Sequence, residues 1–129
     1  MERNYQEGQV WTFRGAPLPQ SRVVVGKIDQ YAGHHDLVFS VSIIKVPIPN
    51  TGAGGIRIAD ISHAPVSKSV LDASLLEQVG AGEPSGSFGE GYDQWRLAYL
   101  AGDAGVFSVE ISKVIEIICD VVVKGTPVS

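Results

Sequence analysis

The chain has 129 residues, of which 44% are hydrophobic and 19% are charged, as expected for one globular domain with a buried core. This composition excludes a disordered tail, and no apolar run reaches the roughly 18 residues that a membrane span requires. One cysteine cannot form an internal disulfide, and residues 1–7 are too polar for a secretory signal. We therefore expect a single cytoplasmic domain over residues 1–129.

The net charge of −4 is unevenly distributed along the chain. Residues 1–70 carry +2 and residues 71–129 carry −6. The basic side chains of the first part stand singly among apolar residues, which is typical of solvent-facing strand positions. No basic cluster predicts a phosphate-binding groove, so the pattern argues against a nucleic-acid partner. The acidic second part is typical of the outer faces of helices.

The central strand of the predicted sheet lies at residues 36–46, where large apolar side chains alternate with smaller ones. Successive side chains of an extended chain point to opposite faces, so this segment has one apolar face and one half-polar face. The apolar face contains Leu37, Phe39, Val41 and Ile43. These are mostly β-branched and aromatic residues, which fit a pleated surface.

Three further strands are predicted around the central one. They lie at residues 10–13, 21–29 and 56–61. Gly26 stands inside the second of these, where glycine marks a bulge or a bend. Pro47 and Pro49 end the central strand or leave it at a sheet edge. Residues 50–55 form a hairpin tip rather than a phosphate-binding loop, because a strand and not a helix follows them.

Helical periodicity replaces strand alternation after the sixties. Ser67 or Ser69 can cap a helix that runs to about Val79 and ends at Gly80. A second helix is predicted over residues 90–101. The chain therefore divides into a strand-rich part, 9–61, and a helix-rich part, 67–123.

A third helix is predicted from Ser108 to about Asp120. Its apolar positions recur at helical spacing, at Ile111, Val114, Ile115, Ile118 and Val122. Many of them are β-branched, which weakly favours a strand, and the state of Val121 to Val123 stays open. The predicted fold class is α+β, with an antiparallel meander of about four strands, flat or curled into a half-barrel, covered by about three C-terminal helices.

Few residues could hold a metal or carry out chemistry. His34, His35 and Asp36 are adjacent, and His63 stands alone. Adjacent side chains on an extended segment point apart, and no spaced ligand motif is present, so we expect no metal and no other cofactor. Cys119 lies beside the apolar stripe of the last helix, where a neighbouring aspartate would raise its pKa and keep it inert.

The aromatic residues of the second helix are the strongest candidates for a binding surface. Tyr92, Trp95 and Tyr99 recur at helical spacing, with Arg96 beside them. Aromatic residues next to an arginine are typical of protein-contact hot spots. The same aromatic residues could instead cover the sheet, because a small domain needs large side chains in its core.

Two segments resemble a set of small bacterial proteins to which no activity is assigned. Residues 5–11 read Tyr-Gln-Glu-Gly-Gln-Val-Trp, and residues 91–107 begin with Gly-Tyr-Asp-Gln-Trp-Arg and end with Ala-Gly-Asp-Ala-Gly-Val-Phe. Those proteins open with a Gly-x-Val-Trp strand and close with a Gly-Tyr-x-x-Trp-Arg helix and an Ala-Gly-x-x-Gly-Val-Phe turn. The resemblance implies a bacterial, cytoplasmic, single-domain protein.

The start of the chain is also similar to that of small-barrel ribonuclease toxins. The similarity covers residues 8–11, a proline-rich loop and residues 22–25. Those toxins have an Arg-Gly-Glu type of loop after the first strand, of which only Arg14 and Gly15 are present, and they tend to be basic. The similarity implies an enzyme whose pocket unites Arg14, a histidine and an acid.

The sequence contains no convergent nucleophile, base or ligand set. It therefore favours a non-enzymatic protein-interaction or binding module of a bacterial cytoplasm, of the immunity or adaptor kind, with another protein as its partner. Two alternatives stay open. One is the ribonuclease-toxin-like enzyme, and the other is a structural homodimer formed through Ile117 and Val121.

Overall fold

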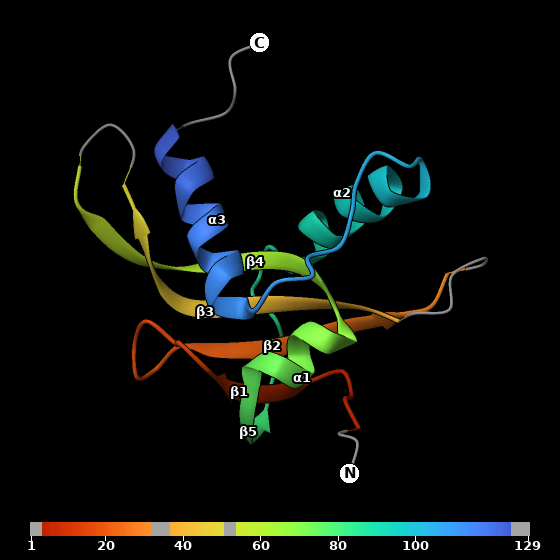
Figure 1. The fold of residues 1–129 in the computed structure, drawn as a ribbon, viewed down its shortest axis with the longest axis horizontal. Coiled ribbons are helices and arrows are strands. Elements are labelled where there is room, and N and C mark those ends of the chain that lie inside the picture. The colour runs from red at the N-terminus through yellow and green to blue at the C-terminus, as the bar shows by residue number, and fades with distance from the viewer. Residues whose placement is uncertain (1–3, 32–36, 51–53, 125–129) are drawn as a thin grey trace.

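The computed structural model of the chain describes residues 4–31, 37–50 and 54–124. Five antiparallel strands form one sheet in the order β4-β3-β2-β1-β5, accompanied by three helices (Figure 1). The strands are β1 (Gln9–Phe13), β2 (Arg22–Asp29), β3 (Val38–Pro49), β4 (Ile56–Ser67) and β5 (Leu75–Ala81). The helices are α1 (Lys68–Ser74), α2 (Phe88–Leu100) and α3 (Ile111–Lys124). The predicted α+β class is confirmed, and the sheet is not closed into a barrel.

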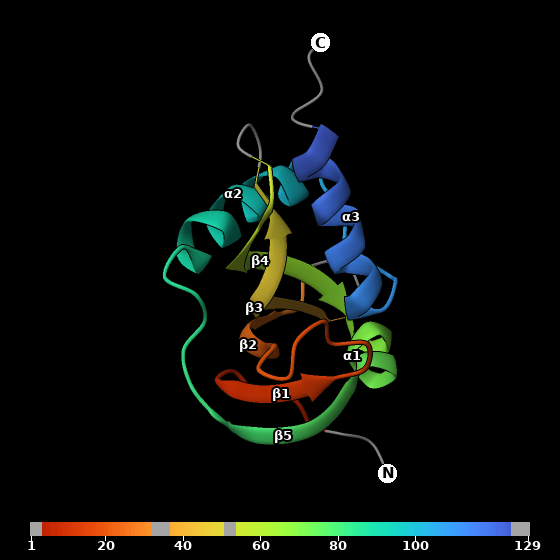
Figure 2. The same ribbon diagram turned by 90° about the vertical axis from the view of Figure 1, so that its left-hand side faces the viewer.

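The helices lie on both faces of the sheet. Figure 2 shows α1 and α3 on one side and α2 on the other. The reason is that β3 is buried on both faces, since Phe39 and Val41 are buried on one and Ser40 and Ser42 on the other. Leu37, predicted to face the core, precedes β3 and is exposed. Within the described residues, no helix combines the length and hydrophobicity needed to cross a membrane.

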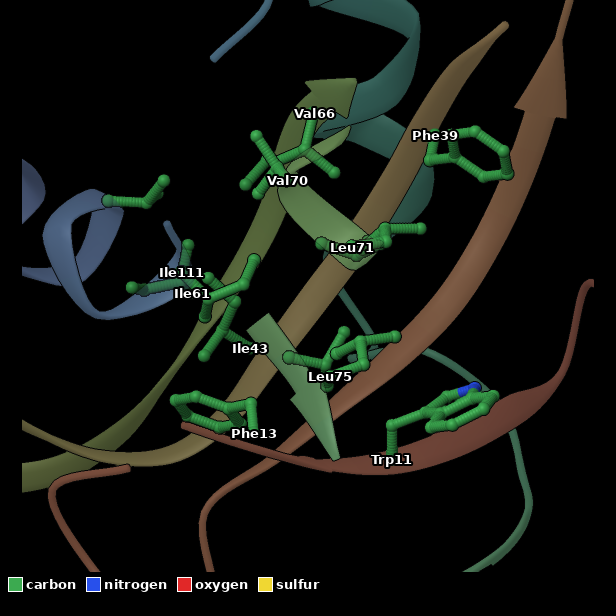
Figure 3. Close-up of a cluster of buried hydrophobic side chains, with 14 of the residues drawn as sticks. Trp11, Phe13, Phe39, Ile43, Ile61, Val66, Val70, Leu71, Leu75 and Ile111 are labelled. Carbon is green, nitrogen blue, oxygen red and sulfur yellow. The ribbon is translucent and has the colours of Figure 1, made fainter. Parts of the chain in front are cut away.

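The main core lies between the sheet and the pair α1 and α3. Figure 3 shows it, with Trp11 and Phe13 of β1 facing Leu75 and, beyond it, Ile43 of β3. The predicted apolar stripe of the last helix is confirmed, because every member is buried in this core or packs against it. The stripe is Ile111, Val114, Ile115, Ile118 and Val122. The helix continues through Val121 to Val123, which answers the question the sequence left open.

The prediction of a helix through Val79 is wrong, because α1 ends at Ser74 and residues 75–81 form a fifth strand. The outer edge of β1 decides this outcome, since β1 has only β2 on its other side. The carbonyl of Ser74 accepts a hydrogen bond from the Arg14 amide (2.7 Å), and the Glu77 amide donates to Thr12 Oγ1 (3.1 Å). Pairing with β1 therefore overrides a sequence whose residues favour a helix.

Several predicted boundaries also shift. The central strand, predicted at residues 36–46, is β3 at Val38–Pro49, and two further shifts have an identifiable cause. The fourth strand was expected to end at Ile61, but β4 continues to Ser67 because its second half pairs with the first half of β3. The last helix was expected to begin at Ser108, but α3 begins at Ile111. Phe107, four residues before α3, is bonded to β4 instead of to a helix. Its amide donates to the Pro65 carbonyl, and its carbonyl accepts from the Ser67 amide. The loop between α2 and α3 therefore covers part of the β4 edge.

The prolines and the glycine of the sheet have the predicted positional roles. The pairing of β2 with β3 ends at Ile44, so Pro47 and Pro49 lie where β3 has β4 as its only strand neighbour. Gly26 occupies a bulge, since the β2–β3 register shifts between its two neighbours. A Cβ atom at Gly26 would overlap the ring of Phe88, so the glycine also lets α2 approach the sheet.

We predict that Gly26→Ala destabilises the protein by about 1–3 kcal/mol, because the added methyl group must displace the buried ring of Phe88. The matched control is Gly89→Ala in α2, whose Cβ would meet no atom within 4 Å. The control should leave stability unchanged or raise it by up to about 1 kcal/mol through helix propensity. Urea unfolding measures both variants, and equal effects would contradict the close packing of α2 on β2.

Candidate functional site

Six aromatic side chains gather where α2 packs on the sheet, and we call them the aromatic cluster. They are Tyr31, His63, Phe88, Tyr92, Trp95 and Tyr99. The rings of Phe88 and Tyr92 are stacked with centroids 5.8 Å apart, and those of Trp95 and Tyr99 with centroids 4.8 Å apart. Tyr92, Trp95 and Tyr99 thus lie on one side of α2, as their spacing predicts, although the rings of Tyr92 and Trp95 are tilted rather than stacked.

The spacing of the four rings on α2 explains why they share one face. Residues three and four apart on a helix are neighbours, so positions 88, 92, 95 and 99 line the side toward the sheet. Phe88 is buried and Tyr92, Trp95 and Tyr99 are half-buried. Most of the surface of these aromatic side chains is therefore buried against the sheet. This agrees with the second of the two hypotheses from the sequence, that the aromatic residues cover the sheet.

His63 is the centre of the aromatic cluster. Its ring lies 5.5 Å from that of Phe88, 5.9 Å from Tyr92 and 5.5 Å from Trp95, between ring centroids. Its Nε2 is hydrogen-bonded to the hydroxyl of the buried Ser40 at 2.9 Å. Burial lowers the pKa of His63 from 6.5 to about 4, so the ring is neutral at pH 7.

Three members of the aromatic cluster, His63, Tyr92 and Trp95, have hydrogen bonds inside the protein, whereas the buried Tyr31 hydroxyl has no hydrogen-bond partner among the described residues. The Tyr92 hydroxyl donates to the carboxylate of Asp29 at 2.6 Å, and Trp95 Nε1 donates to the Gly105 carbonyl at 2.9 Å. Burial is the main cause that raises the pKa of Tyr31 and of Tyr92, and the hydrogen bond to Asp29 adds to the effect at Tyr92. Hydrogen bonds of this kind hold the rings in place and leave fewer groups to bind a ligand.

The outer side of α2 differs from its inner side. Arg96, the fourth predicted site residue, is exposed but interacts with Tyr31 of the aromatic cluster, so it belongs to the flank of α2. Leu97 and Leu100 are 68% and 55% exposed, although large apolar residues usually turn inward on a helix that lies on a sheet. Glu90 and Asp93 precede them at positions of the same helix side and are also exposed. The outer face of α2, defined by Glu90, Asp93, Leu97 and Leu100, is thus apolar at one end and acidic at the other.

A hollow of about 290 Å3 lies beside the loop that follows α2. Gly105, Val106 and Phe107 line it. Trp95 bonds the Gly105 carbonyl, so the hollow adjoins the aromatic cluster. The side chains of these three described lining residues carry no titratable or nucleophilic group.

Of the weak metal candidates, the structure describes only His63. His34, His35 and Asp36 lie outside the described residues, and His63 is bonded to Ser40 within the aromatic cluster. Among the described residues, no three histidine, cysteine, aspartate or glutamate side chains are grouped as a metal would require. His63, read from the sequence as a lone residue, serves instead in packing between β4 and α2.

The toxin similarity implies a pocket that contains Arg14 and a histidine, and Arg14 and His63 lie apart. Gly15, next to the exposed Arg14, approaches Ser112 of α3, and His63 lies under α2 on the opposite face of the sheet. A pocket that unites Arg14 with His63 is therefore not formed. Burial and the neighbouring Asp120 raise the pKa of the Cys119 thiol, in agreement with its predicted inert role.

Sequence reasoning found Tyr92, Trp95 and Tyr99 of the aromatic cluster but missed Phe88 at the start of α2, and Tyr31 and His63 outside it. Phe88 could have been found from its position four residues before Tyr92, because residues at this spacing are neighbours on a helix. Nothing local identifies Tyr31 or His63, because their contacts depend on how β2 and β4 meet α2.

Comparison with known proteins adds no further identification. No family model, curated protein or solved structure matches the chain.

We predict that the protein loses stability as the pH falls from 6.5 toward 4. The unfolded chain protonates His63 near its ordinary pKa of 6.5, and the folded chain does so only near 4, so the unfolded state binds more protons in this window. Urea unfolding at several pH values should show the decline, and His63→Gln should flatten it. A titration of the His63 ring by NMR with a midpoint near 6.5 would contradict the proposed burial.

Proposed function

We propose that the protein is a non-enzymatic binding module that docks onto another protein through the outer face of α2. The observation that carries the proposal is the pair of exposed leucines, Leu97 and Leu100, one turn apart on a helix whose other side already covers the sheet. Exposed apolar side chains that adjoin one another on a helix are the anchors that partner grooves accept.

The aromatic cluster supports the proposal by holding α2 rigidly. Trp95 and Tyr92 are bonded to groups outside the helix, and Phe88 is fixed against Gly26. A helix held in this way loses little conformational entropy when a partner binds its outer face. In this proposal the aromatic residues expected from the sequence, Tyr92, Trp95 and Tyr99, are the support, and Arg96 flanks the contact.

The charge of the outer face indicates the kind of partner. Glu90 and Asp93 lie on the same side as the leucines, toward the helix N-terminus. A partner with an apolar groove for Leu97 and Leu100 and a basic rim toward Glu90 would match this face in both shape and charge. An immunity or adaptor role in a bacterial cytoplasm accords with such a partner.

We predict that Leu97→Ser combined with Leu100→Ser weakens partner binding at least about tenfold, because both apolar anchors are removed. The aromatic residues are unsuitable for this test, since they support the fold. The measurement is quantitative capture, with a photoreactive group at the exposed Gln94 to fix the partner and mass spectrometry to identify it.

The matched control for this pair lies on α3. Val121→Ser combined with Val123→Ser changes side chains that are 54% and 65% exposed, close to the exposure of Leu100 and Leu97. Proteins that the wild type and the α3 control capture equally, and that the α2 variant loses, support the proposal. If the α2 variant remains folded by circular dichroism and retains every captured protein, the outer face of α2 is not the contact.

A further inference from the structure

The first half of β4 is an open sheet edge. Residues 45–49 of β3 and 56–60 of β4 extend beyond β2 as a two-stranded ribbon, which we call the hairpin arm. The Asn50 amide donates to the Gly55 carbonyl at 2.9 Å and closes the arm, so the predicted hairpin tip is confirmed. Within the described residues, Ile56 to Asp60 pair with β3 alone.

One face of the arm is covered and the other is not. Val46 and Ile48 are buried against the core, and Cys119 of α3 donates through Sγ to the Pro47 carbonyl at 3.7 Å. In Figure 1 the β4 strand of the arm lies on the side away from α3. Ile56 and Ile58 point to the uncovered face, where they are 68% and 55% exposed.

Among the described residues, the free edge of β4 in the arm is more regular than the other strand edges. Pro47 and Pro49 interrupt the free edge of β3 in the arm, because proline has no amide hydrogen to donate. Phe107 covers the second half of β4, and two register shifts distort the pairing of β5. By contrast, the four pairs from Val46↔Ala59 to Pro49↔Ile56 follow without a shift. A regular edge strand with exposed isoleucines pairs readily with another strand.

We propose that the arm binds a second copy of this chain, with the two β4 strands pairing antiparallel about a two-fold axis. A two-fold axis lets one edge serve both partners and closes the assembly as a dimer. It also brings Ile56 and Ile58 of each copy onto one face of the extended sheet. A sheet edge of fixed hydrogen-bonding pattern matches its own copy without any further complementarity.

The arm's charges determine the register of the pairing. Centring the pair on Arg57 would place two guanidinium groups directly opposite each other, which is unfavourable. Centring it on Ile58 places Ile58 opposite its own copy, Arg57 opposite Ala59 and Ile56 opposite Asp60, so that no two like charges face each other directly. We therefore assign the two-fold axis to Ile58.

The dimer is expected to be weak. Few residues meet at the arm, so the interface is smaller than the about 800 Å2 per partner of a stable complex. The association should therefore appear in sedimentation velocity between about 10 µM and about 1 mM, as a rise in mass to twice that of the monomer. Ile58→Lys should leave the fold unchanged and abolish the rise, since two lysines would oppose each other at the axis.

A cysteine scan tests the assigned axis directly. In a Cys119→Ser background, Ile58→Cys should form a disulfide-linked dimer under mild oxidation, because opposite positions of paired strands approach the distance that a disulfide requires. Val121→Cys in the same background is the matched control, since Val121 is 54% exposed and represents the alternative dimer through α3.

The outcomes separate the possible assemblies. Two results together support a dimer through the arm. Disulfide cross-linking is at least about tenfold faster at position 58 than at position 121, and the mass from sedimentation does not rise above that of the dimer. Equal rates, faster cross-linking at 121, growth beyond the dimer or a constant monomer mass at the highest concentration would each overturn the proposal. None of these results depends on whether α2 binds another protein.

Discussion

The architecture depends on burying both faces of β3. Apolar residues such as Phe39 and Ile43 are covered by α1 and α3, while Ser40 and Ser42 on the reverse face must keep hydrogen bonds once water is excluded. Ser42 Oγ donates to the Ser62 carbonyl and accepts from the Ser85 amide, and Ser40 bonds His63. These bonds make it possible for α2 and the segment before it to cover a face that carries polar groups.

The packing of α2 on the reverse face of the sheet follows from this constraint. It also determines where the two candidate surfaces, the outer face of α2 and the hairpin arm, lie. The reverse face has little apolar area on the strands, so α2 supplies it with Phe88 and the other rings of the aromatic cluster. Its outer leucines are then left toward solvent. The hairpin arm and α2 extend to different sides of the molecule (Figure 1). A dimer formed through the arm would thus present two α2 helices at once, and a partner with repeated sites would bind it with a gain from multivalency.

Local patterns predicted those features that depend on nearby residues. Alternation identified β3, the spacing from Ile111 to Val122 identified the buried side of α3, and Gly26 was recognised as a bulge. The failures arose where a distant segment decides the outcome. Residues 75–79 have helical spacing, but the edge of β1 draws them into a strand, and no pattern near His63 indicates that α2 will enclose it. The exposure of Leu97 and Leu100 could be recognised only when it was known which side of α2 packs on the sheet.

The late arrival of β5 in the chain has a kinetic consequence. Thr12 of β1 and Glu77 of β5 bond each other although they are 65 positions apart, whereas the two strands of the arm are joined by a short turn. Closing a long loop costs entropy before its contacts can compensate, so the arm can form early and the β1–β5 pair must wait. Assembly then proceeds from the middle of the polypeptide outward. β2 can pair with β1 early, but the other edge of β1 gains its neighbour β5 only after synthesis has passed α1, more than half of the way along the chain.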